Sequence, residues 1–198
     1  STSDLTWGEF CRQCSACTAC DLAEGRQSVV IWRGAVQAPL LFIGEGPGAE
    51  EDRLGKPFVG RSGELLDRLL TAHGFTPDDY HICNIVKCRP PGNRKPTPEE
   101  VQACKPWLRQ QFLFVRPKVI CLLGGTAYQY FTGDEGRISS VRGKWIESNG
   151  YSILPTFHPS YILREPGKRD LFWHDMAAVR GRMEELDLLE PLQAIPDP

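Results

Sequence analysis

The sequence predicts a single α/β domain built around a mainly parallel sheet. Three short apolar runs, "PLLFIG", "YHICNIV" and "PKVICLLG", have the composition of buried strands. Segments with helical spacing of apolar residues separate these runs, and strands that alternate with helices are typical of a parallel sheet. With 198 residues, of which 41% are hydrophobic, the chain can bury one good core. We therefore expect one domain over residues 1–198.

The first elements follow one another in a regular order. A strand ends near Ile43, and the helix after it, "SGELLDRLLTAHG", is expected to have Ser62 as its N-cap. The strand "YHICNIVK" precedes a helix that is capped by Thr97, with Pro98 at its first position and Glu100 closing a capping box. The strand "PKVICLLGG" leads into a short helix, "GTAYQYF".

A hairpin and a closing helix complete the fold. Asn149 and Gly150 are the strongest short hairpin signal in the chain, and the second arm of this hairpin runs into a fourth core strand. The segment "KRDLFWHDMAAVRGRMEEL" is the last helix. The Pro-rich residues 190–198 are expected to be a loose tail.

Charge and composition restrict the class of protein. The formal net charge of −2 argues against nucleic-acid binding through global charge, but basic residues gather in loops and favour a local phosphate-binding face. No leader with a basic and then an apolar region is visible, and no apolar run approaches transmembrane length. We therefore expect a cytoplasmic protein without a membrane partner, in a reducing compartment where clustered cysteines bind metal more often than they pair.

The N-terminal stretch "FCRQCSACTAC" places Cys11, Cys14, Cys17 and Cys20 at every third position. A bacterial ferredoxin run ends in C-x3-C-P, whereas here Cys20 comes only three positions after Cys17 and precedes Asp21. In a helix, each step of three residues would turn the side chain back by about 60°, so the first and last thiols would face opposite sides. Two or three of these thiols can share one metal centre, and its other ligands must come from elsewhere.

The chain contains four more cysteines. Cys83 and Cys121 lie in strand-like apolar runs, where we expect them to be small core residues. Cys88 and Cys104 flank a basic, Pro-rich loop and its helix.

Three segments follow predicted strands, and ligands of parallel sheets bind beyond the carboxyl ends of the strands. "GEGPGAEED", residues 44–52, combines three glycines with four carboxylates, which suits the close approach of a flat ligand better than a phosphate. "NIVKCRPPGNR" begins at Asn84 and continues as the basic loop, up to Arg94. "FHPSYILR", residues 157–164, places His158 directly after the last strand. These segments predict a site at one edge of the sheet.

With "GKPFVGRSGELL", these segments resemble the family 4 uracil-DNA glycosylases, the iron–sulfur branch of the uracil-DNA glycosylase superfamily. The motifs of that family occur here in the same order, as Gly44–Asp52, Gly55–Leu66, Asn84–Pro96 and His158–Arg164. The resemblance covers most of the chain, from about Cys17 to Arg164. It implies a three-layer α/β domain with a central, mainly parallel four-stranded sheet flanked by helices.

The activity that the resemblance implies is DNA repair. Such an enzyme flips uracil out of single- or double-stranded DNA and hydrolyses its N-glycosidic bond, which releases free uracil and leaves an abasic site. We expect a monofunctional enzyme, because none of the residues that the resemblance places in the pocket is a lysine that could attack the sugar, although Lys87 is close in sequence. We also expect a monomer.

The resemblance further implies the ligands of a [4Fe–4S] cluster. Cys17 and Cys20 are followed by a leucine and an arginine at the spacing of the family's first cysteine pair, whereas Cys11 and Cys14 lack this context, and the second pair corresponds to two more cysteines. The implied ligands are Cys17, Cys20, Cys88 and Cys104. The cluster would thus tie the cysteine-rich N-terminal segment, residues 1–26, to the basic loop, and its role would be structural. The same thiols would suit a structural zinc ion.

For the base, the resemblance implies four binding residues. Phe58 would stack on the uracil ring, and Gly46 would leave room for the base. Asn84 would donate to O4 and accept the N3–H group, a pattern that cytosine reverses. His158 would stabilise the negative charge that develops at uracil O2, which is worth about 3–4 kcal/mol.

A carboxylate is expected to stabilise the cationic sugar and to position water. Family 1 relatives use an Asp in their first motif, and this chain has Gly46 at that place. Glu45 is therefore the first candidate and Glu51 the second. Glu51 could instead exclude the methyl group of thymine.

DNA contacts are expected from the loop after His158. Tyr161, Ile162 or Leu163 could enter the base stack in place of the flipped nucleotide, while Arg164 pairs with a phosphate. Alternatively, the two aliphatic residues pack on the last helix. Arg94 of the basic loop is also expected to contact DNA.

Two other functions compete with this interpretation. A DNA-binding module that holds iron–sulfur or zinc without catalysis would explain the cysteines and basic loops, but not the pocket residues. A related branch that crosslinks to uracil-DNA resembles GEQPG followed by a basic insert with a nucleophilic histidine. Here Gly46 replaces that Gln, and "RPPGNRKPTP" contains no histidine.

Overall fold

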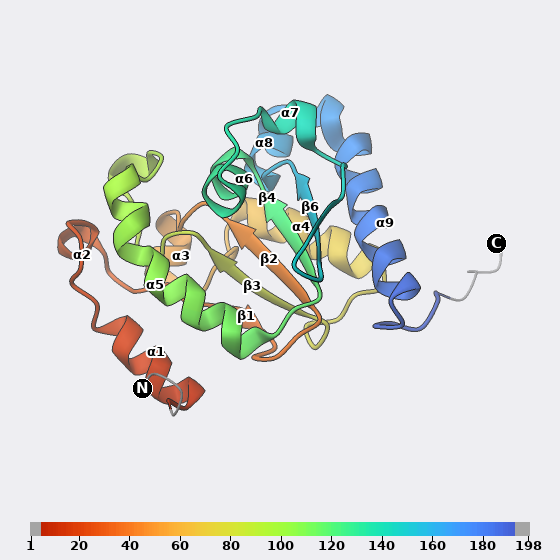
Figure 1. Ribbon diagram of the computed structural model, residues 1–198. Helices are drawn as coiled ribbons and strands as arrows, with labels where there is room; N and C mark the ends of the chain where they lie inside the picture. The colour runs from red at the N-terminus through yellow and green to blue at the C-terminus, as the bar shows by residue number, and fades with distance from the viewer. Residues whose placement is uncertain (1–4, 193–198) are drawn as a thin grey trace.

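A computed structural model describes residues 5–192, and its centre is a six-stranded sheet in the order β1-β3-β2-β4-β6-β5 (Figure 1). The strands are β1 (Arg33–Gly34), β2 (Leu40–Gly44), β3 (Tyr80–Asn84), β4 (Val119–Leu123), β5 (Ile146–Ser148) and β6 (Tyr151–Thr156). The four inner strands are parallel to one another, whereas β1 and β5 pair antiparallel at the two edges. The predicted α/β class with a mainly parallel sheet is therefore confirmed.

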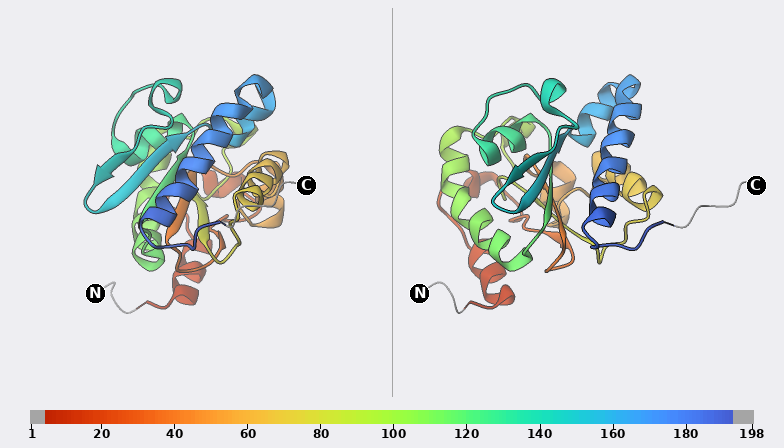
Figure 2. Two further views of the ribbon diagram at one scale, coloured as in Figure 1. Left: turned by 90° about the vertical axis from the view of Figure 1, so that its right-hand side faces the viewer. Right: turned by 45° about the vertical axis from the view of Figure 1, so that its right-hand side comes forward.

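Helices cover both faces of this sheet. They are α1 (Trp7–Ser15), α2 (Leu22–Gly25), α3 (Ala49–Leu54), α4 (Arg61–Ala72), α5 (Pro98–Val115), α6 (Gly125–Thr132), α7 (Ile138–Val141), α8 (Pro159–Arg164) and α9 (Arg169–Glu185), with 3-10 turns η2 (Pro91–Asn93) and η3 (Pro166–Lys168). Successive residues of a strand point to opposite faces. Accordingly, Phe42 belongs to one apolar cluster with Met176 of α9, and Ile43 belongs to another with Val101 of α5. The result is three layers, with α4 and α9 on one side of the sheet and α5 and α6 on the other (Figure 2).

The resemblance implied four strands, and the sheet has six because it gains two edge strands. β1 is only two residues long, too short for any periodic pattern, and it forms by pairing with β3. β5 is the first arm of the predicted hairpin, which turns at Asn149 and Gly150 with positive φ angles of 51° and 83°. The residues of β5 are mostly exposed, so apolar content does not mark it as part of the sheet.

Helix boundaries agree with the sequence at α5 and differ at α4. The side chain of Thr97 accepts the N–H of Glu100 and the Glu100 carboxylate accepts the N–H of Thr97, so the predicted capping box is confirmed. The predicted N-cap at Ser62 was wrong, because α4 begins at Arg61 and Gly60 is its N-cap, two residues earlier. Gly60 has no side chain to cap the helix, and its own N–H donates to the Glu51 carboxylate at 2.7 Å.

Both ends of the described chain are packed against helices. Phe10 of α1 lies 5.9 Å from the ring of Trp107 in α5, which anchors the N-terminal segment. Residues 190–192, the described part of the tail predicted to be loose, are held by two hydrogen bonds. Arg180 of α9 donates to the carbonyl of Glu190 at 2.6 Å, and Leu192 N–H donates to Glu184 at 3.1 Å. Residues 193–198 lie outside the described residues. The described helices include none with the length and apolarity that a membrane-spanning segment needs.

Candidate functional site

The loops at the carboxyl ends of β2, β3 and β6 line one pocket. Its volume of about 470 Å³ lies within the range of roughly 300–1,000 Å³ that is usual for ligand pockets. Its lining residues are Glu45, Gly46, Pro47, Gly48, Glu51, Phe58, Ser62, Asn84, Pro90, Asn93, Arg94, His158, Ser160 and Arg164. The structure thus brings together all the residues that we expected to bind the base or take part in catalysis. Of the expected DNA contacts, Tyr161 and Leu163 lie outside this lining.

Asn84 ends β3 with its amide directed into a confined space. The residue is 1% exposed, and its Oδ1 has no hydrogen-bond partner among the described residues. A Cβ atom on Gly44 would lie only 2.6 Å from this oxygen and 2.5 Å from the ring of Phe58, so only glycine allows this arrangement. Leaving a buried acceptor unpaired costs about 1–3 kcal/mol. A ligand that supplies an N–H group to Asn84 would recover that free energy.

His158 follows β6 and caps α8 with its imidazole. Its Nδ1 accepts the backbone N–H of Ser160 at 3.1 Å, and the Ser160 hydroxyl lies 2.7 Å from the same nitrogen. Because a backbone N–H can only donate, Nδ1 carries no proton and the proton of the neutral ring is on Nε2. Burial and then the charge of Arg164 lower the pKa of His158 to about 4. The neutral side chain therefore offers Nε2–H as a donor at neutral pH.

Phe58 adopts an unusual backbone conformation beside His158. Its φ of 54° lies in the left-handed region, which a residue with a bulky side chain rarely adopts. Its ring stacks on the His158 imidazole, with the two ring centroids 5.4 Å apart. The surrounding structure must therefore hold the backbone at this position.

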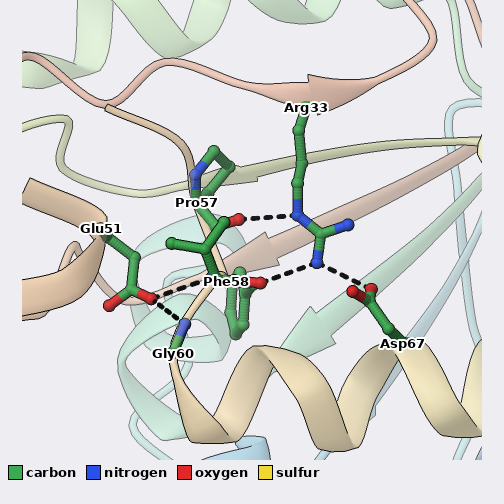
Figure 3. A network of polar contacts seen from close by, with 7 residues as sticks. Arg33, Glu51, Pro57, Phe58, Gly60 and Asp67 are labelled. Carbon is green, nitrogen blue, oxygen red and sulfur yellow. Dashed lines mark hydrogen bonds and ion pairs between the residues drawn. The ribbon is translucent and has the colours of Figure 1, made fainter. Parts of the chain in front are cut away.

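Two side chains hold the backbone on either side of the Phe58 ring (Figure 3). Arg33 of β1 donates to the carbonyls of Pro57 and Phe58, at 2.7 and 2.8 Å, and is itself paired with Asp67. The Glu51 carboxylate accepts the N–H groups of the two residues that follow Phe58, at 2.9 and 2.7 Å. The stacking ring is thus fixed in place before any ligand binds.

The four carboxylates of the loop after β2 have different partners. Glu50 forms an exposed ion pair with Arg53, and Asp52 is buried and accepts the backbone N–H groups of Gln27 and Ser28 at 2.8 and 3.1 Å. Glu51 holds the backbone around the stacking ring. Glu45 lines the pocket and accepts the hydroxyl of a threonine in α6, Thr126, at 2.7 Å. Of the two candidate carboxylates, Glu45 is therefore the one that is not committed to backbone N–H groups.

A second hollow continues from the pocket across the surface. It shares His158 and Arg164 with the pocket and adds Lys95, Arg137 and Tyr161. The basic side chains among these could each pair with a phosphate, although Glu45 and Glu135 also line the hollow.

The expected DNA-contacting side chains differ in exposure. Ile162 is 0% exposed within the core, so it is not available to enter a duplex, and Tyr161 packs 5.0 Å from the ring of Phe157. Leu163 is partly exposed. Arg94 is bound through two hydrogen bonds to Glu100, at 2.8 and 2.9 Å.

The four cysteines with implied metal-binding roles line one cavity between the N-terminal segment, the basic loop and α5. The cysteines around it are Cys14, Cys17, Cys20, Cys88 and Cys104. Cys14, which the resemblance does not include among the ligands, is thus a fifth thiol at this cavity. Cys83 and Cys121 are buried in the core, as predicted. Within residues 5–192, no group of three or more His, Cys, Asp or Glu side chains is arranged to hold a single metal ion.

The hydrogen bonds that three of these sulfur atoms accept suit thiolate ligands of a metal centre. Trp107 Nε1 donates to Cys17 Sγ at 3.2 Å, Arg26 donates to Cys88 Sγ at 3.6 Å, and the backbone N–H of residue 87 donates to Cys104 Sγ at 3.3 Å. Such N–H groups favour the charged form of sulfur, which is the form that binds iron or zinc.

Several residues of the site were missed by sequence reasoning. Thr126 follows the carboxyl end of β4, so the rule that located the other three loops would also have found it. Ser160 lies inside the motif that contains His158, but its bond to that residue depends on the cap geometry of α8. Arg33 lies on the two-residue strand β1 and had no sequence signal.

The chain is similar to proteins of one family. The model of the "Uracil DNA glycosylase superfamily" matches residues 31–179. A "Type-4 uracil-DNA glycosylase" of Thermotoga maritima is 50% identical over 150 residues, which cover 75% of this chain and 78% of that protein. Proteins of the same name from Archaeoglobus fulgidus and Saccharolobus solfataricus are 36% and 40% identical, and they cover 86% and 83% of this chain and 90% and 80% of their own lengths.

Proposed function

The chain belongs to the uracil-DNA glycosylase superfamily, and we propose that its activity resides in the pocket at the carboxyl ends of β2, β3 and β6. It is a uracil-DNA glycosylase, a hydrolase of DNA repair. One observation carries the assignment of the pocket: the unpaired Oδ1 of Asn84 lies in the same lining as the neutral His158. An acceptor and a donor are thus available for the edge of a flipped base.

Uracil recognition requires a hydrogen-bond pattern that cytosine does not match. Asn84 accepts the N3–H of uracil through Oδ1 and donates its amide N–H to O4. Phe58 stacks on the ring, in the position that Arg33 and Glu51 enforce. The expected role of Gly46 in leaving room for the base stays a prediction; a Cβ there would lie 2.8 Å from a neighbouring valine side chain.

Cleavage of the N-glycosidic bond leaves uracil as an anion and the sugar as an oxocarbenium-like cation. Nε2–H of His158 donates to the oxygen O2, where negative charge develops, and no proton has to be gained by the ring for this role. Glu45 stabilises the cationic sugar and positions the attacking water, with Thr126 orienting its carboxylate. Glu51 acts as a positioning residue for Phe58, because its oxygens already accept backbone N–H groups.

A [4Fe–4S] cluster is the metal centre that we propose, with Cys17, Cys20, Cys88 and Cys104 as ligands. The cluster would supply a rigid crosslink rather than chemistry on the substrate. The residues around it attach the N-terminal segment to the loop that precedes α5. A tetrathiolate zinc site is the alternative, and iron and zinc analysis separates the two.

DNA would lie across the pocket and the adjoining hollow. Arg164 is exposed at both and is suited to pair with a phosphate, while Lys95 and Arg137 extend the basic surface. Arg94 contributes charge, although Glu100 fixes its guanidinium. The monomeric state and the cytoplasmic location stay predictions.

Release of free uracil is the test of the proposed function. The protein is expected to release uracil from DNA that carries a single uracil, and the strand should stay intact until alkali or heat is applied. Asn84→Asp is expected to release uracil at least about tenfold more slowly and to discriminate less against cytosine, because the acid changes the donor and acceptor pattern. Unchanged uracil release by this variant would remove Asn84 from base recognition.

The same assay separates the competing functions. DNA binding without release of uracil would favour a non-catalytic module, and a covalent adduct would favour the crosslinking branch. Strand cleavage without alkali would contradict a monofunctional enzyme.

Leu163 and Tyr161 are both partly exposed and remain candidates for the side chain that fills the gap left by the flipped nucleotide. Leu163→Ala is expected to slow uracil release from duplex DNA several-fold more than from single-stranded DNA, because a single strand has no base stack to refill. Parallel rates on the two substrates measure this difference. Equal losses on both would mean that Leu163 packs against the protein instead.

A further inference from the structure

A buried lysine lies between the cysteine cavity and the base-binding pocket. Lys87 is 1% exposed and lines the cavity together with the cysteines. Its Nζ donates to the backbone carbonyl of Asn84 at 2.8 Å. Lys87 therefore contacts the backbone of the residue whose amide faces the pocket, and it does so from the side of the cavity.

Burial of this ammonium group needs compensation. Removing a charged group from water is strongly unfavourable unless a partner offsets the loss. None of the ion pairs in the described part of the chain includes Lys87. Glu100 also lines the cavity, but Arg94 binds both of its carboxylate oxygens. The carbonyl of Asn84 supplies only a partial negative charge.

The thiols of the cavity supply the missing negative charge when they bind a metal centre. The backbone N–H of Lys87 donates to Cys104 Sγ at 3.3 Å. The Lys87 side chain lines the same cavity as this thiol and the thiols of Cys17, Cys20 and Cys88. Thiolates around an iron–sulfur cluster would pair with the Lys87 ammonium at low dielectric, where charges interact strongly.

We propose that Lys87 is a positioning residue that couples the cluster to uracil recognition: its ammonium group balances the thiolate charge and holds the carbonyl of Asn84 at the end of β3. This inference rests on the proposed cluster and on the proposed role of Asn84. It gives the cluster an effect on the pocket that a remote crosslink would not have, because Lys87 lines the cysteine cavity and its ammonium group also donates to the carbonyl of Asn84.

Two variants and one control separate the charge of Lys87 from its hydrogen bond. Lys87→Met removes both, and Lys87→Gln removes the charge but keeps an N–H donor. Lys105→Met removes the same charge from an exposed lysine that directly follows Cys104. Each protein is measured with its cluster bound, for the dissociation constant of free uracil by calorimetry and for the midpoint reduction potential of the cluster by voltammetry.

Lys87→Met is expected to bind free uracil about tenfold more weakly, because Asn84 loses a charged donor. Its cluster potential should become more negative, since an added electron is no longer stabilised by the ammonium. Lys87→Gln should show the same fall in potential with uracil binding closer to that of the parent, and Lys105→Met should change neither quantity. If Lys87→Met does not fold, Lys87→Ala, which also lacks a donor, replaces it in the uracil measurement, while the potential of Lys87→Gln still tests the charge.

An unchanged uracil affinity in Lys87→Met, or an unchanged potential in both variants, would overturn the proposal. This failure differs from failure of the proposed function, in which the parent protein itself would not bind uracil.

Discussion

Replacing His158 by asparagine or alanine is expected to lower the rate of uracil release at least about a hundredfold, while DNA binding stays nearly intact. The structure gives the reason. Nδ1 accepts the N–H of Ser160, so the only ring proton is on Nε2, where it can stabilise charge at uracil O2. Single-turnover rates on uracil-containing DNA measure the loss, and binding to an abasic product measures the affinity.

The asparagine variant separates this role from helix capping. His158 is the N-cap of α8, and asparagine is a good N-cap residue, so His158→Asn keeps the cap and loses Nε2–H. His174→Ala, at an exposed position of α9, is the control that should leave the rate unchanged. Uracil release by His158→Asn within a few-fold of the parent would show that the assigned role is wrong.

The lowered pKa of His158 also determines how protonation affects stability. The pKa falls from 6.5 to about 4 in the folded protein, so the unfolded chain binds a proton first as the pH decreases. The contribution of this residue to stability is therefore complete above pH 6.5 and is lost as the pH falls towards 4. In the neutral range the ring is uncharged, as its proposed role requires.

The core strands β2, β3 and β4 could be predicted from the sequence because they are short and mainly apolar. β2, β3 and β4 are buried on both faces, and this burial requires the residues that identified them. The edge strand β1 could not be predicted, because its two residues pair with β3 through backbone groups that any sequence offers. Its position matters nevertheless, since it brings Arg33 to the carbonyl of Phe58.

Site residues that end or directly follow a strand could be predicted from the sequence. Site residues whose position depends on tertiary packing could not. Asn84 and His158 end or follow parallel strands, so topology alone brings them to one edge. The function of Glu51 depends on a loop that returns after α3, and that path is set by tertiary contacts. Lys87 was noticed only for its closeness in sequence, because nothing in the sequence indicated that its side chain is buried beside the cysteine cavity.

The cysteine cavity contains one more N-terminal thiol than the proposed ligand set uses. Cys14 lines the cavity with the four proposed ligands, so a pair made of Cys14 and Cys17 rivals the proposed pair of Cys17 and Cys20. Cys14 has a separate reason to be buried, because it packs in an apolar cluster with Phe10 and Ile31. Cys11 is not in the cavity lining.

The last prediction compares single alanine variants of these four N-terminal cysteines. Cys17→Ala and Cys20→Ala are expected to lose the iron and the brown colour and to unfold more readily, because the free energy of cluster binding is part of the free energy of folding. Cys11→Ala should match the parent. Cys14→Ala should keep its full iron content, with only the modest loss of stability that follows from a small buried side chain. Iron and sulfide analysis with thermal unfolding measures all four, and Cys121→Ala controls for the loss of a buried thiol that does not line the cavity. Cluster loss in Cys14→Ala together with retention in Cys20→Ala would transfer the ligand role to Cys14.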